Sequence, residues 1–183
     1  MEEKIENNMI PVVTLRDIVV FPGTTVYFEI GRESTINAVN EAMHGEKLIF
    51  TVAQKDQYVE NPGIDDVYEI GTLAEVKQII TLPDKIMRVV IVGIKRQRLK
   101  YVETVNDHLA GSLEDVPETG DTSYTLEVIA YVRGLKDLFK VYSDEVGKIN
   151  KQIIQEIMDC TDLDRLIYMI SSNLPVNYQL KQK

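Results

Sequence analysis

Side chains that could carry out catalysis are few and scattered along this chain of 183 residues. Its Gly-Lys pair, Gly147-Lys148, has Tyr142 where a phosphate-binding loop needs its first glycine, and Ile149 where the loop needs a hydroxyl. The chain also lacks the Gly-x-Ser-x-Gly segment that presents a nucleophilic serine in many hydrolases. The sequence therefore predicts neither a nucleotide-binding loop nor a serine nucleophile of this kind.

The histidines and the single cysteine do not form a recognisable site. His44 and His108 are far apart in the sequence, and Cys160 has no second cysteine at the spacing of a metal site. A Cys–His nucleophile pair stays open, because sequence separation does not exclude one, but Cys160 falls between two expected helices and is better explained as a small packing residue. We therefore predict no catalytic residues, no metal ligands and no bound cofactor.

Charged side chains gather in three short groups. Asp65-Asp66 and Glu114-Asp115 lie in expected turns, where solvated surface is the simplest interpretation. Arg96, Arg98 and Lys100 recur at every second position and so share one side of a strand. Such a basic row indicates either the charged face of an edge strand or a nucleic-acid contact. A formal net charge of −9 disfavours binding to phosphate backbones, so we prefer the first interpretation.

Apolar residues gather around two turns, and they are the strongest candidates for a binding surface. Ile79 and Ile80 come before the Pro83-Asp84-Lys85 turn, and apolar residues also adjoin the turn itself. Alternation breaks down there, so the side chains are either covered by another part of the fold or exposed to a partner. The Val20-Phe21-Pro22 turn has the same two interpretations, with burial of Phe21 preferred. The predicted binding residues are Phe21, Pro22, Leu82, Pro83, Ile86 and Met87.

Composition indicates a folded protein. Hydrophobic residues make up 44% of the chain, and no apolar run approaches the ~20 residues needed to span a bilayer. The first ten residues do not resemble a secretory signal, and a single cysteine excludes an internal disulfide. We therefore expect a cytoplasmic location.

The pattern up to Val105 predicts about six strands and one helix, which together suggest a curved barrel. The expected strands begin at Pro11, Val26, Lys47, Val67, Met87 and Lys95. Gly71, inside the fourth strand, predicts a bulge or bend. The helix should begin at an N-cap, Ser34, should end at Gly45, and should bury Ile36, Val39 and Met43.

The period becomes helical after a stretch rich in glycine, proline and acidic residues that begins at Ala110. Three amphipathic helices are expected. The stripe of the first consists of Leu126, Ile129, Val132, Leu135 and Phe139, and the third begins at a cap, Thr161 or Asp162. Val176 to Lys183 is typical of the start of another helix, so we expect a piece of a longer protein. The predicted parts are a disordered N-terminus over 1–8, a barrel over 9–112, a linker over 113–122 and a helical subdomain over 123–183.

Several segments resemble the N-terminal domain of Lon-type ATP-dependent proteases. The opening, from Pro11 to Gly23, reads Pro-Val-Val-Thr-Leu-Arg-Asp-Ile-Val-Val-Phe-Pro-Gly. Further matching segments follow in the family's order. They are Gly31 to Glu33, Val52 to Asp56, Asp66 to Thr72, Leu82 to Asp84, Val92 to Arg96 and, in the helical part, Ser172 to Pro175.

The resemblance implies an α+β fold with a PUA-like β-barrel followed by a helical subdomain. It also implies a non-catalytic fragment that binds unfolded or damaged proteins and supports assembly of a homohexameric protease ring. ATP, Mg and a Ser-Lys dyad would belong to the ATPase and protease modules of a longer protein. Because PUA-like barrels also occur elsewhere, a free-standing RNA-binding or protein-interaction domain stays an alternative, as does a purely structural oligomerisation module.

Overall fold

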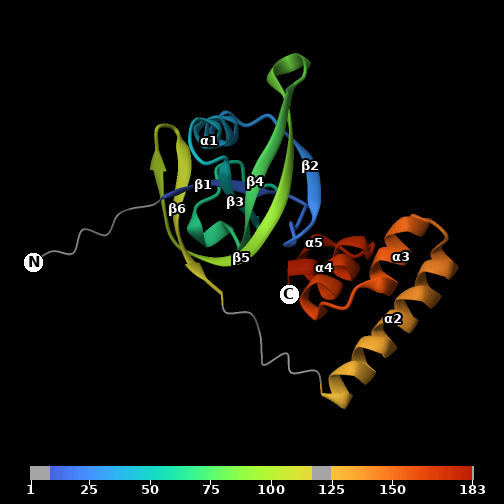
Figure 1. Ribbon diagram of the computed structural model, residues 1–183. Helices are drawn as coiled ribbons and strands as arrows, with labels where there is room; N and C mark the ends of the chain where they lie inside the picture. Colours follow the sequence, from blue (N-terminus) through green and yellow to red (C-terminus); the bar gives the residue numbers. More distant parts are fainter. Residues whose placement is uncertain (1–8, 117–124, 183) are drawn as a thin grey trace, which may run out of the picture. The chain divides into compact units, whose positions relative to one another are not determined.

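The barrel is formed by the N-terminal half of the chain. The computed structural model describes residues 9–116 and 125–182, and its first compact unit contains residues 9–116 and 176–182 (Figure 1). The strands are β1 (Ile10–Leu15), β2 (Thr25–Ile30), β3 (Leu48–Ala53), β4 (Ile70–Thr81), β5 (Met87–Val105) and β6 (His108–Asp115). They follow the order β2-β5-β4-β3-β1-β6, and β5 also pairs with β6. This additional pairing closes the sheet, so the expected barrel and α+β class are confirmed.

Strand β5 closes the sheet because it pairs with two different strands along one of its edges. Its first part, Met87–Val92, pairs with β2, and its later part, from Gln97 to Val105, pairs with β6. The sequence pattern predicted two strands here, Met87–Ile94 and Lys95–Val105, but the structure has one strand of 19 residues. Register shifts in its pairings with β4 and β6 supply the bending that a continuous strand needs in a barrel.

The barrel unit has two hydrophobic clusters, and neighbouring residues of one strand serve different clusters. Val13 and Ile49 belong to the cluster that includes helix α1 (Glu33–His44), whereas Val12 and Phe50 belong to the second cluster. Because successive side chains of a strand point to opposite faces, β1 and β3 need apolar residues on both faces. This explains why these strands are continuously apolar rather than alternating.

Helix α1 differs from the prediction in its start and in its buried face. Its N-cap is Arg32, without a side-chain capping bond, so the prediction of Ser34 is wrong. Gly45 is the C-cap, as expected. The buried residues are Thr35, Ala38, Val39 and Ala42, whereas Met43 is exposed. Small side chains allow the helix backbone to approach the sheet closely, and this preference shifts the buried stripe away from the larger residues.

Strand β6 occupies sequence that composition alone assigns to a domain boundary. The predicted boundary began at Ala110, and the predicted linker covered 113–122, but β6 continues to Asp115. Gly111 lies within β6. This position favours glycine because a side chain there would overlap Leu99 and Val12 of the neighbouring strands. A residue that resembles a loop glycine is therefore a close-packing residue. The remainder of the predicted linker from 117 onwards, like the predicted disorder at 1–8, lies outside the described residues.

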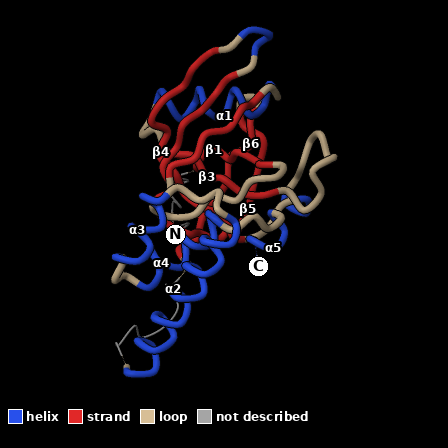
Figure 2. Tube along the Cα trace, turned by 90° about the vertical axis from the view of Figure 1, so that its right-hand side faces the viewer, coloured by secondary structure: helices blue, strands red, loops and turns tan. Residues whose placement is uncertain are grey.

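The second unit contains the helices α2 (Leu126–Val146), α3 (Lys151–Asp159) and α4 (Leu163–Asn173). Figure 2 distinguishes these helices from the strands of the barrel by colour. Asp162 caps α4 by accepting a hydrogen bond of 2.7 Å from the Arg165 backbone N–H, which confirms one of the two predicted caps. The predicted stripe on α2 is wrong at its start, since Leu126 is 87% exposed. The later part of the stripe is confirmed, because Phe139 is buried in a core with Ile157, Leu166 and Ile170, and Val132 and Leu135 pack against that core.

The last helix, α5 (Tyr178–Gln182), belongs with the barrel rather than with the other helices. The Tyr178 hydroxyl donates to the Lys55 carbonyl at 3.4 Å, and the Gln182 amide donates to the Ile70 carbonyl at 2.8 Å. The sequence-based division, which placed 123–183 in one helical subdomain, therefore differs from the structure at its end. Within the described residues, no helix combines the length and the apolar character that crossing a membrane requires.

Candidate functional site

The β4–β5 hairpin extends beyond the rest of the barrel unit (Figure 1). Its tip carries apolar side chains that are partly exposed. A short 3-10 turn, Pro83–Lys85, connects the strands, and the Leu82 N–H donates to the Ile86 carbonyl at 2.8 Å. Asp84 has a φ of 62° and Lys85 one of 59°. Aspartate tolerates this left-handed conformation better than most residues, so the Pro-Asp-Lys sequence suits a tight turn.

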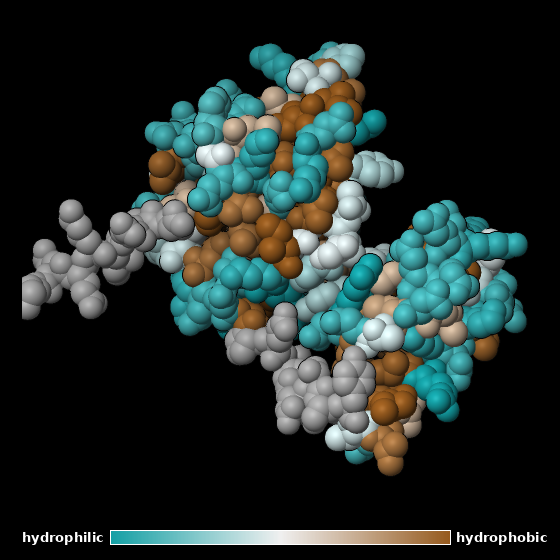
Figure 3. Space-filling model, viewed as in Figure 1, coloured by the Kyte–Doolittle hydropathy of each residue, from teal (hydrophilic) through white to brown (hydrophobic). Residues whose placement is uncertain are grey.

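The tip presents a small apolar surface to solvent, visible along the hairpin in Figure 3. Leu82 and Ile86 are half-buried, Pro83 is exposed, and the adjacent Ile80 is 39% exposed. Met87 differs, because it packs against the larger barrel cluster. The exposed tip surface is therefore formed by Ile80, Leu82, Pro83 and Ile86, which we call the tip patch.

Phe21 and Pro22 lie in a different place. Their loop is fixed against the middle of β5, where the Gly23 N–H donates to the Gly93 carbonyl at 2.9 Å and the Gly93 N–H donates to the Thr24 carbonyl at 3.0 Å. A side chain at Gly93 would overlap the Phe21 carbonyl, so this contact requires glycine. Both Phe21 and Pro22 are half-buried rather than fully buried.

The predicted binding residues therefore form two separate groups. At a rise of about 3.3 Å per residue, the stretch of β5 from Met87 to Gly93 spans about 20 Å. Leu82, Pro83 and Ile86 share the hairpin tip, whereas Phe21 and Pro22 lie at the other end of this stretch. A role for either group in binding stays a prediction.

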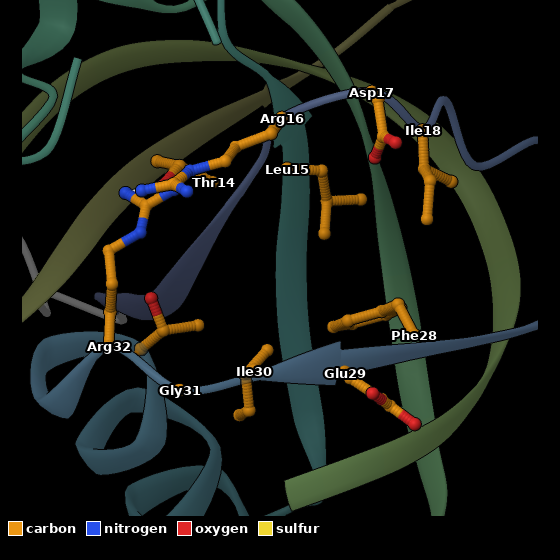
Figure 4. A pocket seen from close by; sticks show the side chains of 11 residues that line it. Thr14, Leu15, Arg16, Asp17, Ile18, Phe28, Glu29, Ile30, Gly31 and Arg32 are labelled. Carbon is orange, nitrogen blue, oxygen red and sulfur yellow. The ribbon is translucent and has the colours of Figure 1, made fainter. Parts of the chain in front are cut away.

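A third candidate, which sequence reasoning missed, is a pocket of about 300 Å³ between β1, β2 and the start of α1 (Figure 4). The side chains of Arg16 and Arg32 meet at one end of it, while Asp17 and Glu29 lie toward the other end. Apolar side chains line the space between them, namely Leu15, Ile18, Phe28 and Ile30. The pocket thus combines a cationic end with an apolar wall.

Arg32 is fixed in this pocket by several acceptors. Its Nη2 donates to the side-chain oxygen of the fully buried Gln54 at 2.5 Å, and its Nη1 donates to the Glu60 carbonyl at 3.1 Å and to the Thr14 hydroxyl at 3.4 Å. Burial lowers the pKa of Arg32, and the Arg16 guanidinium lowers it further. No local sequence pattern could have predicted these contacts, because the residues come from β1, β3 and the loops beside them.

The basic row on β5 is matched by carboxylates on the neighbouring strands. Arg98 pairs with Glu69 at 2.7 Å, and Lys100 pairs with Glu114 at 3.4 Å. Lys95 pairs with Asp115 at 2.6 Å, and its hydrogen bond lowers the pKa of that carboxyl, with a further hydrogen bond from Gln97. This local pairing supports the interpretation of the row as a charged strand surface.

Each residue with catalytic potential is described by the contacts within its own unit. Within residues 9–116 and 125–182, no three His, Cys, Asp or Glu side chains gather into a possible metal site. His44 contacts the Asn40 carbonyl on its own helix, and His108 is buried in the barrel unit. Cys160 belongs to the helical unit, where its thiol donates to the Asp162 carbonyl at 3.3 Å.

Comparison with known proteins relates this arrangement to one family. Residues 9–183 match the family described as the ATP-dependent protease La (LON) substrate-binding domain. The Lon protease of Lachnoclostridium phytofermentans is 34% identical over 173 residues, which are 94% of this chain and 21% of that protein. The Lon protease of Clostridioides difficile is 33% identical over 183 residues, which are 98% of this chain and 23% of that protein. The chain therefore spans about a fifth of the length of these relatives.

Solved structures share the fold. The N-terminal domain of the Mycobacterium avium complex Lon protease has a TM-score of 0.76 at 19% identity, with 95% of this chain and 88% of that chain covered. A Lon N-terminal domain protein from Xanthomonas campestris has a TM-score of 0.54 at 12% identity, with 91% of this chain and 99% of that chain covered.

Proposed function

The chain belongs to the family of Lon substrate-binding domains, and on that premise we propose that it captures unfolded or damaged proteins with the tip patch of its β4–β5 hairpin. The observation that carries this proposal is the apolar, partly exposed end of a hairpin that extends from the barrel. Unfolded proteins expose apolar segments that folded proteins bury, so an exposed apolar surface distinguishes the two.

The small size of the tip patch fits weak capture. Complete burial of one large apolar side chain contributes about 1.5–3 kcal/mol, and the side chains of the tip patch are already partly covered. Ordering a flexible substrate offsets part of this gain. A contact of this strength releases its substrate readily, as delivery to another module requires.

The activity of a longer parent protein is part of the same proposal. We infer an ATP-dependent serine endopeptidase whose ATPase module uses ATP and Mg and whose protease module carries the Ser-Lys dyad, with delivery of captured proteins to these modules. The named relatives are Lon proteases more than four times as long as this chain. A cytoplasmic location stays a prediction.

We propose a Leu82→Ser/Ile86→Ser variant as the test of the tip patch. It spares Met87, because Met87 packs in the core and its loss would confuse binding with stability. Binding to a permanently unfolded, fluorescently labelled protein should weaken about tenfold, since two apolar contacts worth about 1.4 kcal/mol together are lost. The free energy of unfolding should change by about 1 kcal/mol or less.

An Ile64→Ser/Leu180→Ser variant is the matched control, since both side chains are exposed and lie outside the tip. It should bind the unfolded protein as the original chain does. Equal binding by the tip variant, or an equal loss in both variants, would contradict the role of the tip.

Assembly with further copies of the chain is a second proposed role, supported by the outer face of α2. Tyr131, Leu138 and Val141 lie on that helix with 69%, 70% and 62% of their surface exposed. Each falls within about 80° of its neighbour around the helix axis, so they share one face. Such a face is typical of a helix that packs against a partner.

A Leu138→Glu/Val141→Glu variant tests this second role. If copies associate through α2, light scattering at high protein concentration should show a larger mass for the original chain than for the variant, because buried charges oppose packing. The far-ultraviolet circular dichroism of both should match, since the substituted side chains are exposed. The same monomer mass for both proteins at every concentration would count against it.

A further inference from the structure

The pocket beside Arg16 and Arg32 concentrates positive charge in a chain whose net charge is −9. The two side chains approach each other from different segments, Arg16 after β1 and Arg32 before α1 (Figure 4). Like charges repel, and Arg32 is partly buried, where that repulsion is screened less than at the surface. An arrangement of this kind becomes favourable when an anion lies between the two groups.

Nearby carboxylates do not neutralise the pair. Within the described residues, neither Arg16 nor Arg32 forms an ion pair. Glu60 accepts a hydrogen bond from Arg32 through its main-chain carbonyl, and its carboxylate raises the pKa of Arg32 by less than burial and Arg16 lower it. Glu29 is already paired with Arg88 at 2.6 Å. Asp17, the remaining acid in the lining, lies away from the two guanidinium ends in Figure 4.

The position of Arg32 is built into the core of the barrel unit. Gln54 is fully buried, its amide donates to the carbonyls of Asp56 and Val59, and its oxygen accepts from Arg32. The three protein acceptors of Arg32 use three of the five N–H donors of a guanidinium group. Because this guanidinium group is already fixed and has free N–H donors, binding of an anion requires little further loss of side-chain entropy.

We propose that this pocket binds a carboxylate joined to an apolar stretch of polypeptide. The carboxylate would lie between Arg16 and Arg32, and the apolar side chain beside it would contact the half-buried Ile18 and the exposed edges of the core residues Leu15 and Ile30. Guanidinium groups match the planar geometry of carboxylates, and the apolar wall favours a group attached to a side chain over a fully hydrated inorganic anion. This inference rests on the proposed function, because it names the chemical group that a captured protein would present to a second contact.

Two sources can supply this group, the free C-terminus of a polypeptide or an acidic side chain. Three short acetylated peptides distinguish them, measured by calorimetry or fluorescence on the intact chain. The first ends in leucine with a free carboxylate, the second is its amide, and the third is an amide with glutamate before the leucine. Binding of the first or the third, with no more than weak binding of the second, supports the inference and identifies the source.

Arg16→Gln is the main variant, since the Arg16 side chain is exposed and forms no ion pair with any residue in the described part of the chain. It should weaken binding of the carboxylate peptide about tenfold, as expected for loss of a charge-assisted hydrogen bond. Arg98→Gln changes the net charge equally but lies outside the pocket, and it should bind like the original chain. Arg32→Lys should also weaken binding, because an ammonium group lacks the planar fork.

Three results would overturn the inference. The first is equal affinity of the free-acid and amidated peptides. The second is unchanged affinity in Arg16→Gln. The third is a pocket that binds inorganic phosphate but none of the peptides. The tip variant Leu82→Ser/Ile86→Ser separates this failure from failure of the proposed function. If that variant loses binding of the unfolded protein while the carboxylate has no effect, the proposed function stands and the pocket assignment falls.

Discussion

A Leu166→Ala variant is expected to unfold the helical unit at a markedly lower temperature while the barrel unit stays folded. Leu166 is completely buried, and it shares its cluster with Phe139, Ile157 and Ile170. Removing a buried leucine side chain costs about 2–5 kcal/mol. A unit described over residues 125–175 has a small core, so a loss of this size is comparable to its whole stability.

Scanning calorimetry combined with circular dichroism at 222 nm measures this effect, since most of the described helix lies in the second unit. Leu166→Met is the matched control, because it keeps the volume and should cost less than about 1.5 kcal/mol. The tip variant experiment can be repeated on Leu166→Ala, where binding of the unfolded protein should persist. A single transition in which both units melt together would show that the helical unit does not unfold independently.

A Phe50→Ala variant should destabilise the barrel unit by about 3–5 kcal/mol, the largest effect that we expect from one substitution. Phe50 is fully buried on β3 and belongs to the second barrel cluster with Val12, Val52 and Leu99. Its ring also lies against Gly71 at the base of the β4–β5 hairpin. Loss of the ring therefore leaves a cavity where the hairpin joins the barrel.

Urea unfolding followed by a signal from the barrel measures this change, and Phe50→Leu provides a control that keeps more of the volume. A smaller loss than about 1 kcal/mol would show that the barrel does not depend on this ring. Adding Gly71→Ala should not restore stability, because a side chain there also overlaps the Thr51 carbonyl. Partial unfolding of the barrel should reduce binding at the tip, since the pairing of Phe50 with Leu73 anchors the hairpin.

Gly71 shows how a correct signal can have a different cause. A glycine inside a strand pattern predicted a bulge or bend, yet the register shifts of β4 against β5 occur at Leu73/Ala74 and at Val76/Gln78. Gly71 is instead required by the close approach of Phe50 and the Thr51 carbonyl. A bulge and a close approach of another segment both favour glycine, and only the position of the neighbouring strand distinguishes them.

Local patterns were sufficient for much of the architecture. The period of the apolar residues predicted the change from strands to helices, and turn chemistry predicted the hairpin at Pro83-Asp84-Lys85. The C-cap at Gly45 was also predicted correctly, and Asp162 was one of the two predicted caps of α4, because a cap depends on residues within one helical turn. Features of this kind depend on residues that are close in the sequence and therefore also close in space.

Features that depend on long-range packing could not be obtained in this way. The strand at Gly111, the packing of Met87 against the larger barrel cluster and the attachment of α5 to the barrel all arise from contacts between segments that are distant in sequence. The same holds for Arg16 and Arg32, which meet because β1 pairs with β3 and thereby brings Gln54 beside the start of α1. Each of these residues has an ordinary sequence context, and its role follows from strand pairing that places distant side chains in one pocket.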